Sequence, residues 1–259
     1  MTTPPPVLAE RDGRVGWLTL NRPEALNAIT VELASALERG LRDLSGEVDV
    51  IVVRGAGGNF CVGGDFKELE RLRAAGPEAM APLFDTFGRA LALIAELPVP
   101  VVASVSGYAL AGGFELMQAA DIAIVATDAR IADHHANFGQ VPGGGGSQRL
   151  PRLVGRQRAL AHILTGDALS GAEALAWGLA YRAVPPAELD TATRDLAGRL
   201  AGKNREATAR TKRLVRAGLE LPLTEGLARE RAEVLAHLSG ASAADGIAMF
   251  TSRGADRPT

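Results

Sequence analysis

The stretch "SGYALAGGFELMQAADIAI", residues 106–124, decides the fold. An apolar run, "VPVVASVSG" (99–107), leads into it and predicts a buried strand. A glycine-rich turn follows, a helix begins at "GGFELMQAAD", and "DIAIVA" (121–126) predicts another buried strand. Strands that alternate with helices in this way are typical of α/β proteins. The sequence therefore predicts an α/β fold.

The same alternation occurs earlier in the chain. "VGWLTL" (15–20) predicts a strand, and "VELASALERGLRDL" (31–44) predicts a helix, for which Thr30 is a suitable N-cap. "VDVIVVRG" (48–55) has the continuous apolar character of a buried strand, and a helical segment is expected over about residues 82–97. These elements extend the α/β core toward the N-terminus.

From about residue 152 the sequence becomes mostly helical. "SGAE" (170–173) has the spacing of a capping box, in which Ser and Glu satisfy the first free N–H groups of a helix. Further helices are expected over residues 187–202, 204–218, 222–238 and 242–250. We therefore predict an α/β core over residues 1–195 and a helical C-terminal region over residues 196–259.

Composition excludes several classes of protein. The chain has 259 residues, 47% of them hydrophobic, but its apolar runs are shorter than a membrane span. Its first residues, "MTTPPPVLAE", lack the basic and apolar regions of a signal peptide. The net charge of −2 leaves no basic footprint for nucleic acid, and the single Cys61 excludes an internal disulfide. We expect a cytoplasmic protein with neither a nucleic acid nor a membrane as partner.

Two glycine-rich turns could carry chemistry. "FCVGGDFKEL" (60–69) and "GYALAGGFEL" (107–116) each follow an apolar strand and precede a helical segment. Backbone N–H groups at a helix start have no intrahelical acceptor, and two that converge on one oxygen form an oxyanion hole. Many glycine turns between a strand and a helix are only turns, so this alternative stays open.

Four segments in order resemble the crotonase (enoyl-CoA hydratase/isomerase) superfamily over about residues 7–253. They are "NRPEALNAI" (21–29), "GNFCVGGDFKEL" (58–69), "SGYALAGGFELMQAADIAI" (106–124) and "VPGGGGSQRLPRLVG" (141–155). The resemblance implies a crotonase-like ββα spiral core and a helical C-terminal trimerisation region, assembled as a homotrimer or homohexamer. It also implies an acyl-CoA thioester as substrate, as in fatty acid metabolism, with coenzyme A as part of that substrate and no separate cofactor.

The resemblance also assigns candidate catalytic residues. The N–H groups of Gly64 and Gly112 would hold the thioester oxygen as an enolate forms. Most relatives have alanine at the position of Gly64, but a backbone group does the work there, so glycine should serve. Glu115 would be the main acid/base residue, in the first turn of its helix, where the helix dipole favours its charged form. Ordinary helix capping is the alternative for this residue.

Other residues would bind the substrate. The resemblance places Ala25, Leu26, Asp65, Phe66 and Lys67 along the CoA arm, and Arg253 near the CoA phosphates. For Lys67 and Arg253 a solvated surface charge is an equal alternative. An apolar acyl pocket is suggested by Phe66, Phe84, Phe114 and Leu83.

Hydratases of this superfamily carry a second glutamate twenty residues after the first, and His135 occupies that position here. An imidazole titrates near neutral pH and could move a proton, donate a hydrogen bond or fill space. In an extended segment neighbouring side chains alternate, so we expect His135 to face the pocket opposite Glu115 and His134 to face away. Neither histidine has the spacing of a metal ligand, so no metal is expected.

Three functions remain. The first is an enoyl-CoA hydratase-like lyase that adds or eliminates water. The second is another crotonase reaction (thioester hydrolysis, isomerisation or decarboxylation), because His135 replaces the second glutamate. The third is a non-catalytic acyl-CoA binding protein, which the retained glycine turns and Glu115 make the weakest of the three.

Overall fold

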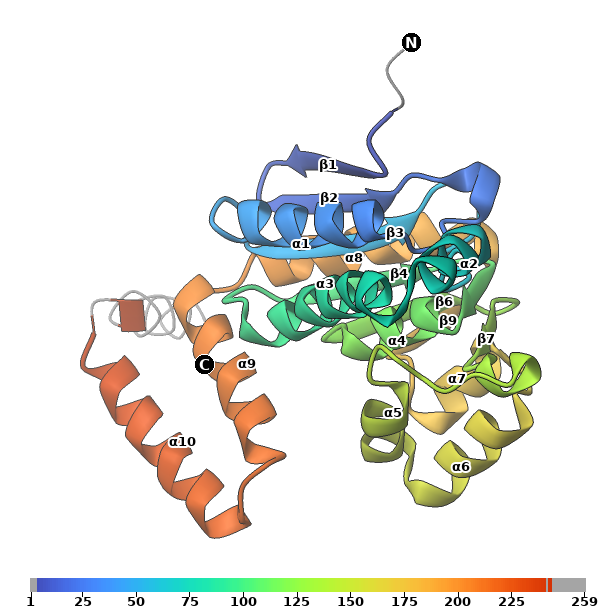
Figure 1. The fold of residues 1–259 in the computed structure, drawn as a ribbon. Helices are drawn as coiled ribbons and strands as arrows, with labels where there is room; N and C mark the ends of the chain where they lie inside the picture. Colours follow the sequence, from blue (N-terminus) through green and yellow to red (C-terminus); the bar gives the residue numbers. More distant parts are fainter. Residues whose placement is uncertain (1–3, 241, 244–259) are drawn as a thin grey trace. The chain divides into compact units, whose positions relative to one another are not determined.

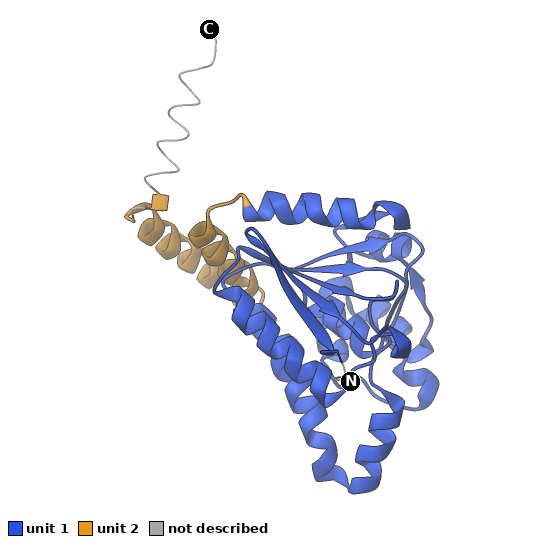
Figure 2. Cartoon of the chain, turned by 90° about the horizontal axis from the view of Figure 1, so that it is seen from above, with its two compact units in different colours: residues 1–201 blue, residues 202–259 orange. Residues whose placement is uncertain are grey.

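The computed structural model describes residues 4–240 and 242–243. The chain forms two compact units, residues 1–201 and residues 202–259 (Figure 2). Helix α8 (Leu189–Ala201) is the last element of the first unit. In the second unit α9 (Arg205–Gly218) and α10 (Leu223–Leu238) contact each other, and an Arg210–Glu233 ion pair of 2.6 Å joins them.

The first unit is built on a mixed sheet whose strand order is β1-β2-β3-β4-β6-β9 (Figure 1). β1 is antiparallel to β2, and every other pair is parallel. The strands are β1 (Val7–Asp12), β2 (Val15–Leu20), β3 (Val50–Gly55), β4 (Val101–Val105), β6 (Ile122–Ala126) and β9 (Arg182–Val184). The four strands predicted from apolar runs are confirmed as β2, β3, β4 and β6. Their burial on both faces explains why those runs are continuous.

Helices cover both faces of this sheet. α1 (Val31–Ser45) contacts β1, β2 and β3, and α3 (Pro77–Glu96) packs along it. α8 contacts β2, β3, β4 and β6 from behind the sheet in Figure 1. The predicted cap of α1 is confirmed, because Thr30 Oγ1 accepts a hydrogen bond of 3.1 Å from the N–H of Leu33.

A second, three-stranded sheet carries the segments that matter for function. It contains β5 (Tyr108–Leu110), β7 (Arg130–Ala132) and β8 (Leu169–Ser170), in that order. β5 and β7 are parallel, with Leu110 opposite Ala132. Parallel strands end at the same edge of a sheet. The residues that follow β5 and β7 therefore meet at one edge, although more than a dozen residues separate them in sequence.

Further helices of the first unit connect the strands of the two sheets. They are η1 (Pro23–Ala25), α2 (Phe66–Ala75), α4 (Gly112–Ala119), η2 (His135–Phe138), α5 (Gly146–Val154), α6 (Arg156–Thr165), α7 (Gly171–Trp177) and η3 (Pro186–Glu188). The capping box at Ser170 is confirmed, since its hydroxyl and the Glu173 carboxylate bond each other's backbone N–H groups. Most of the helix expected over residues 242–250 lies outside the described residues.

Glycine at position 113 lets α4 approach the loop after β3. A Cβ atom on Gly113 would lie 2.1 Å from the carbonyl oxygen of Cys61. By contrast, a Cβ on Gly88, inside α3, would meet nothing within 4 Å. The position of α4 against that loop therefore depends on the absence of a side chain at Gly113.

We predict that Gly113→Ala lowers the free energy of unfolding by about 1–3 kcal/mol, because the backbone must move to relieve the clash. Gly88→Ala is the matched control and should raise it by about 0.5–1 kcal/mol, because alanine favours a helix. Urea unfolding followed by circular dichroism measures both. Equal stability of the two variants would contradict the close packing at Gly113.

Candidate active site

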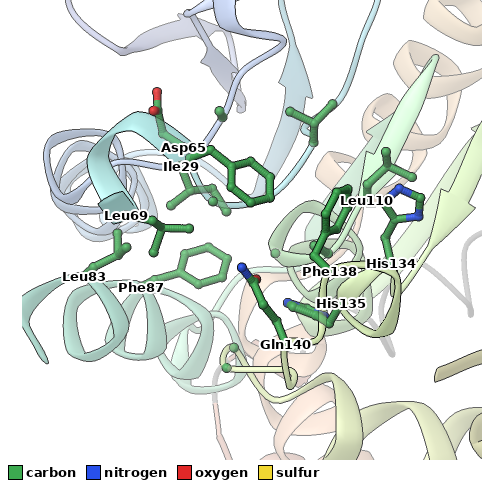
Figure 3. A pocket seen from close by; sticks show the side chains of 18 of the residues that line it. Ile29, Asp65, Leu69, Leu83, Phe87, Leu110, His134, His135, Phe138 and Gln140 are labelled. Atoms are coloured by element: carbon green, nitrogen blue, oxygen red, sulfur yellow. The ribbon is translucent and has the colours of Figure 1, made fainter. Parts of the chain in front are cut away.

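A cavity of about 1330 Å³ opens between the loop after β3, α3 and the segments after β5 and β7. Its wall is largely apolar: in Figure 3 Leu69, Leu83 and Phe87 lie on one side, and Phe138 lies across from them. Glu115 and both histidines of residues 134–135 line the same cavity. An apolar wall with a few polar groups is the usual form of a small-molecule site.

The first glycine turn is held from both sides. The N–H of Ile29 donates to the Gly63 carbonyl (2.7 Å), and the Ile29 carbonyl accepts from the N–H of Asp65 (2.9 Å). These two bonds make a parallel bridge between Ile29 and Gly64, and Cys61 forms another parallel bridge with Ala109. In a parallel bridge the residue between the two bonded ones directs its own N–H away from its partner. The N–H of Gly64 therefore points away from Ile29.

The second glycine turn starts α4. Gly112 is the first residue of that helix, so its N–H has no intrahelical acceptor. Ala111 before it has φ 47° and ψ −118°, a conformation that costs a non-glycine residue energy. The two turns lie against each other, because a Cβ on Gly63 would be 3.0 Å from the Gly112 nitrogen. Gly64 and Gly112 both line the cavity.

The space around Gly64 has little room for a side chain. An added Cβ would lie 3.0 Å from Cδ1 of Leu69 in α2, so an alanine would require a small movement of that leucine. The bonds that hold this turn to Ile29 are made by the backbone of Gly63 and Asp65, on either side of Gly64. The N–H at this position thus does not depend on the side chain.

Glu115 lies in the first turn of α4 with only 2% of its surface exposed. Its Oε1 accepts hydrogen bonds from the N–H groups of Gly144 (2.7 Å) and Gly146 (2.8 Å). Burial raises the pKa of Glu115, although these two N–H groups and the charge of His135 act in the opposite direction. A carboxyl group with a raised pKa in a cavity can exchange a proton nearer to neutral pH.

The four glycines at residues 143–146 therefore do more than turn the chain. A Cβ on Gly144 would lie 2.6 Å from Glu115 Oε2, and one on Gly146 would lie 3.1 Å from Glu115 Oε1. Their lack of side chains lets two N–H groups reach the carboxylate. The sequence alone does not show this role, because nothing in a glycine run identifies the acceptor of its N–H groups.

His135 comes from the segment after β7 and is 11% exposed. Its Nδ1 lies 2.9 Å from Oδ1 of Asp133, a carboxylate that is completely buried. Burial lowers the pKa of His135, but the hydrogen bond and charge of Asp133 and the charge of Glu115 raise it more, so the net shift is upward from 6.5. Sequence reasoning missed Asp133, whose signal was an acid two residues before the histidine.

The expectation that His134 faces away from the cavity is wrong. His134 adopts a left-handed conformation (φ 64°) and His135 starts the 3-10 helix η2, so the segment is not extended and its side chains do not alternate. His134 also lines the cavity, with its ring 5.4 Å from that of Phe138. Its Nδ1 lies 3.0 Å from the side-chain amide of Asn137.

The residues predicted to bind the substrate fall into several groups. Ala25, Phe66, Lys67 and Phe84 line the cavity. Leu26 is not among its lining residues: it has left-handed backbone (φ 51°) at the end of η1 and is 40% exposed. Arg253 lies outside the described residues.

The residues predicted to form an apolar acyl pocket line the cavity with one exception. Leu83 lines the cavity beside Phe84, but Phe114 does not. Phe114 is completely buried and packs its ring 5.4 Å from that of His162. Its apolar character therefore reflects the core.

Asp65 lines the cavity, but its carboxylate is already engaged. Oδ1 caps α2 by accepting from the N–H groups of Lys67 (3.0 Å) and Glu68 (3.2 Å). Oδ2 accepts from the guanidinium of Arg22 at 2.9 Å. Burial alone would raise the pKa of Asp65, but Arg22 and these N–H groups lower it below the ordinary 3.8. Asp65 thus fixes the start of α2 beside the Gly64 turn.

The described residues contain no group of three or more His, Cys, Asp or Glu side chains that could hold a metal ion. Among those residues there is also no helix long and apolar enough to cross a membrane.

Comparison with known proteins identifies the family of the chain. A profile of the family described as enoyl-CoA hydratase/isomerase matches residues 10–256. The chain belongs to the enoyl-CoA hydratase/isomerase family. It is 35% identical over 255 residues to a Mycobacterium bovis protein named probable enoyl-CoA hydratase echA8, covering 98% of this chain and 97% of that one.

Other family members agree. The short-chain-enoyl-CoA hydratase of Clostridium acetobutylicum is 31% identical over 227 residues and covers 86% of each chain. The crystal structure of an enoyl-CoA hydratase from Mycobacterium smegmatis superimposes with a TM-score of 0.90 at 32% identity, over 99% of both chains. The crotonase-like α/β fold expected from the sequence is therefore confirmed, and the protein is a hydratase-like enzyme of this family.

We predict that Asp65→Ala lowers the free energy of unfolding at neutral pH by about 0.5–2 kcal/mol, the usual contribution of a helix cap. Because the folded-state pKa of Asp65 is lowered, its stabilisation is complete above the unfolded value of 3.8 and is lost as pH falls through the folded value. Urea unfolding at neutral pH and near pH 3 should thus show a difference from the parent that shrinks in acid. Asp128 is exposed, and Asp128→Ala, the matched control, should differ little from the parent at either pH. If the loss of stability in Asp65→Ala were the same at both pH values, the cap assignment would be contradicted.

Proposed function

We propose that the protein adds water to the double bond of an enoyl-CoA, or removes it, with Glu115 and His135 as the two proton carriers. The observation that supports this most directly is that both side chains line one cavity and influence each other's pKa. They come from segments that follow parallel neighbouring strands, β5 and β7.

In this proposal the N–H groups of Gly64 and Gly112 bind the thioester oxygen. The electron pair of the double bond moves onto that oxygen when water attacks the β-carbon, and two preorganised donors stabilise the resulting enolate. The free N–H at the start of α4 and the approach of the two glycine turns support this role.

Glu115 and His135 then handle the protons. The Glu115 carboxylate takes a proton from the attacking water as its oxygen bonds to the β-carbon. The His135 imidazolium gives a proton to the α-carbon, which quenches the enolate. Proton exchange between the protonated Glu115 and the neutral His135 restores the starting state, and elimination of water is the reverse.

Coenzyme A enters as part of the substrate, and no separate cofactor is proposed. We assign the CoA arm to the side of the cavity formed by Ala25, Phe66 and Lys67, and the acyl chain to the side formed by Leu83 and Phe84. Arg253 remains proposed for the CoA phosphates. A solvated surface charge is still the alternative for both cations.

A second candidate is another reaction of this family, such as thioester hydrolysis, isomerisation or decarboxylation. The observation in its favour is that the second acid is an imidazole paired with a carboxylate instead of a glutamate. A mass-spectrometric screen of enoyl-, 3-hydroxy- and branched acyl-CoAs for products separates these reactions.

We also propose a homotrimer or homohexamer in the cytoplasm. Large apolar side chains are exposed on the helices of the second unit, among them Val215, Leu219, Leu223 and Leu227. Exposed apolar surface of this kind is common at protein–protein interfaces. The single, buried Cys61 is consistent with a reducing compartment.

We predict that Glu115→Gln lowers turnover of the active acyl-CoA by about 10² to 10⁴, because it preserves the shape and removes the base. In the parent, hydration should follow a bell-shaped pH profile. Activity falls at low pH as Glu115 is protonated and at high pH as His135 loses its proton. Both groups have raised pKa values, so both limbs should lie above their ordinary positions. Near-normal turnover by Glu115→Gln would remove Glu115 from the mechanism.

A separate variant, His135→Glu, restores the acid found in hydratases of this family. If the parent is a dedicated hydratase, the variant should have equal or lower hydration activity, and its alkaline limb should move, because a carboxyl group and not an imidazole then supplies the proton to the α-carbon. A strong gain of hydration over a poor parent would favour the second candidate. Product analysis by mass spectrometry of both proteins on the same acyl-CoAs makes the comparison.

A further inference from the structure

We propose that Asp133 is a positioning residue, which fixes the proton of the neutral His135 ring on Nδ1 and leaves Nε2 as the atom that serves the cavity. This inference rests on the proposed role of His135 and adds a third member to the pair of proton carriers. Asp133 lies directly after β7, two residues before the histidine it orients.

The geometry of the contact supports a fixed tautomer. An ionised carboxylate only accepts hydrogen bonds, so the His135 Nδ1 that lies 2.9 Å from Asp133 Oδ1 must carry a proton. The N–H of His135 also donates to the Asp133 carbonyl at 2.8 Å, which closes a compact turn between the two residues. Nε2 is then the ring nitrogen left to gain and lose a proton, and His135 is one of the residues that line the cavity.

The burial of Asp133 makes a purely structural role costly. The side chain is completely buried, and Oδ2 has no hydrogen-bond partner among the described residues. Burying a carboxylate that is only partly hydrogen-bonded opposes folding. A neutral side chain at this position would oppose folding less. The charge of Asp133 is therefore explained by its interaction with His135.

His162, from α6, does not compete for this charge. Its Nε2 accepts a hydrogen bond of 3.3 Å from the backbone N–H of Asp133, so that nitrogen is unprotonated. Burial lowers the pKa of His162, which keeps the ring neutral. The imidazolium that Asp133 stabilises is therefore that of His135.

The other charged groups around His135 are consistent with this assignment. Glu115, from α4, adds a second negative charge that stabilises the imidazolium. Arg149, from α5, donates to the Gly144 carbonyl beside Glu115. Arg22, Asp65 and Lys67 belong to the wall formed by η1 and α2. Asp133 is the charged group in direct hydrogen-bond contact with the ring.

The test uses ¹⁵N-labelled histidine in the full-length protein, since the chain has only four histidines and each is assigned by its own substitution to Gln. In the parent, neutral His135 should show a protonated Nδ1 and an unprotonated Nε2. Asp133→Asn removes the charge and should lower the pH at which His135 titrates. Asp133→Ala also removes the acceptor and should abolish the preference for the Nδ1 proton.

Turnover gives the second readout. Asp133→Asn should lower kcat by about 10²-fold or more, since loss of the carboxylate that holds a catalytic histidine in its tautomer costs up to about 10⁴ in serine proteases. KM should change little, because Asp133 is not a lining residue of the cavity. The alkaline limb should move to lower pH. Asp128→Asn, an exposed aspartate in the turn before β7, is the matched control and should leave both readouts unchanged.

The outcomes separate the two claims. An unchanged His135 tautomer and titration in both folded Asp133 variants overturns the inference. It is also overturned if Asp133→Asn keeps full turnover while His135→Gln loses it. Full turnover by His135→Gln instead contradicts the proposed function, and the NMR readout still decides whether Asp133 fixes the ring. Asp133→Asn preserves the side-chain shape, so the test does not depend on folding of the alanine variant.

Discussion

A buried carboxylate that must keep hydrogen-bond donors around it organises this site. Glu115 is almost completely removed from water, and an ionised carboxylate without partners in such a place would cost several kcal/mol. Two backbone N–H groups, from Gly144 and Gly146, supply the donors, and a side chain at either position would press against the carboxylate. The glycine run, the start of α4 and the segment after β7 are thus tied to one side chain.

The second sheet and two isolated bridges bring these parts together. The register of β5 with β7 places Glu115 and His135 at one edge, and the bridges of Ile29 and Ala109 hold the loop after β3 against it. Two glycines, at positions 63 and 113, allow backbones to approach where any side chain would clash. The strained Ala111 lies between these contacts, at the start of α4. Strain of this kind is retained where surrounding contacts over-determine the backbone.

Much of this could be predicted from the sequence, because local patterns report local structure. The apolar runs of β2, β3, β4 and β6, the Thr30 cap and the Ser170 capping box need only neighbouring residues to be recognised. The short strands of the second sheet, β5, β7 and β8, lack such a pattern, since two or three residues set no periodicity. The orientation of His134 failed for a related reason: a single left-handed residue ends the alternation on which the prediction rested.

Long-range partners are the part that sequence reasoning could not reach. Gly144 and Glu115 are twenty-nine residues apart, and no property of either names the other. Asp133 was within reach, since it lies two residues from His135, but an aspartate near a histidine has meaning only once both are known to be buried. Burial turns their contact from a surface ion pair of little consequence into one that sets the tautomer of the ring. In the proposed mechanism, the imidazole acts as an acid near neutral pH because a buried carboxylate accompanies it, so the exchange of glutamate for histidine involves a pair of residues.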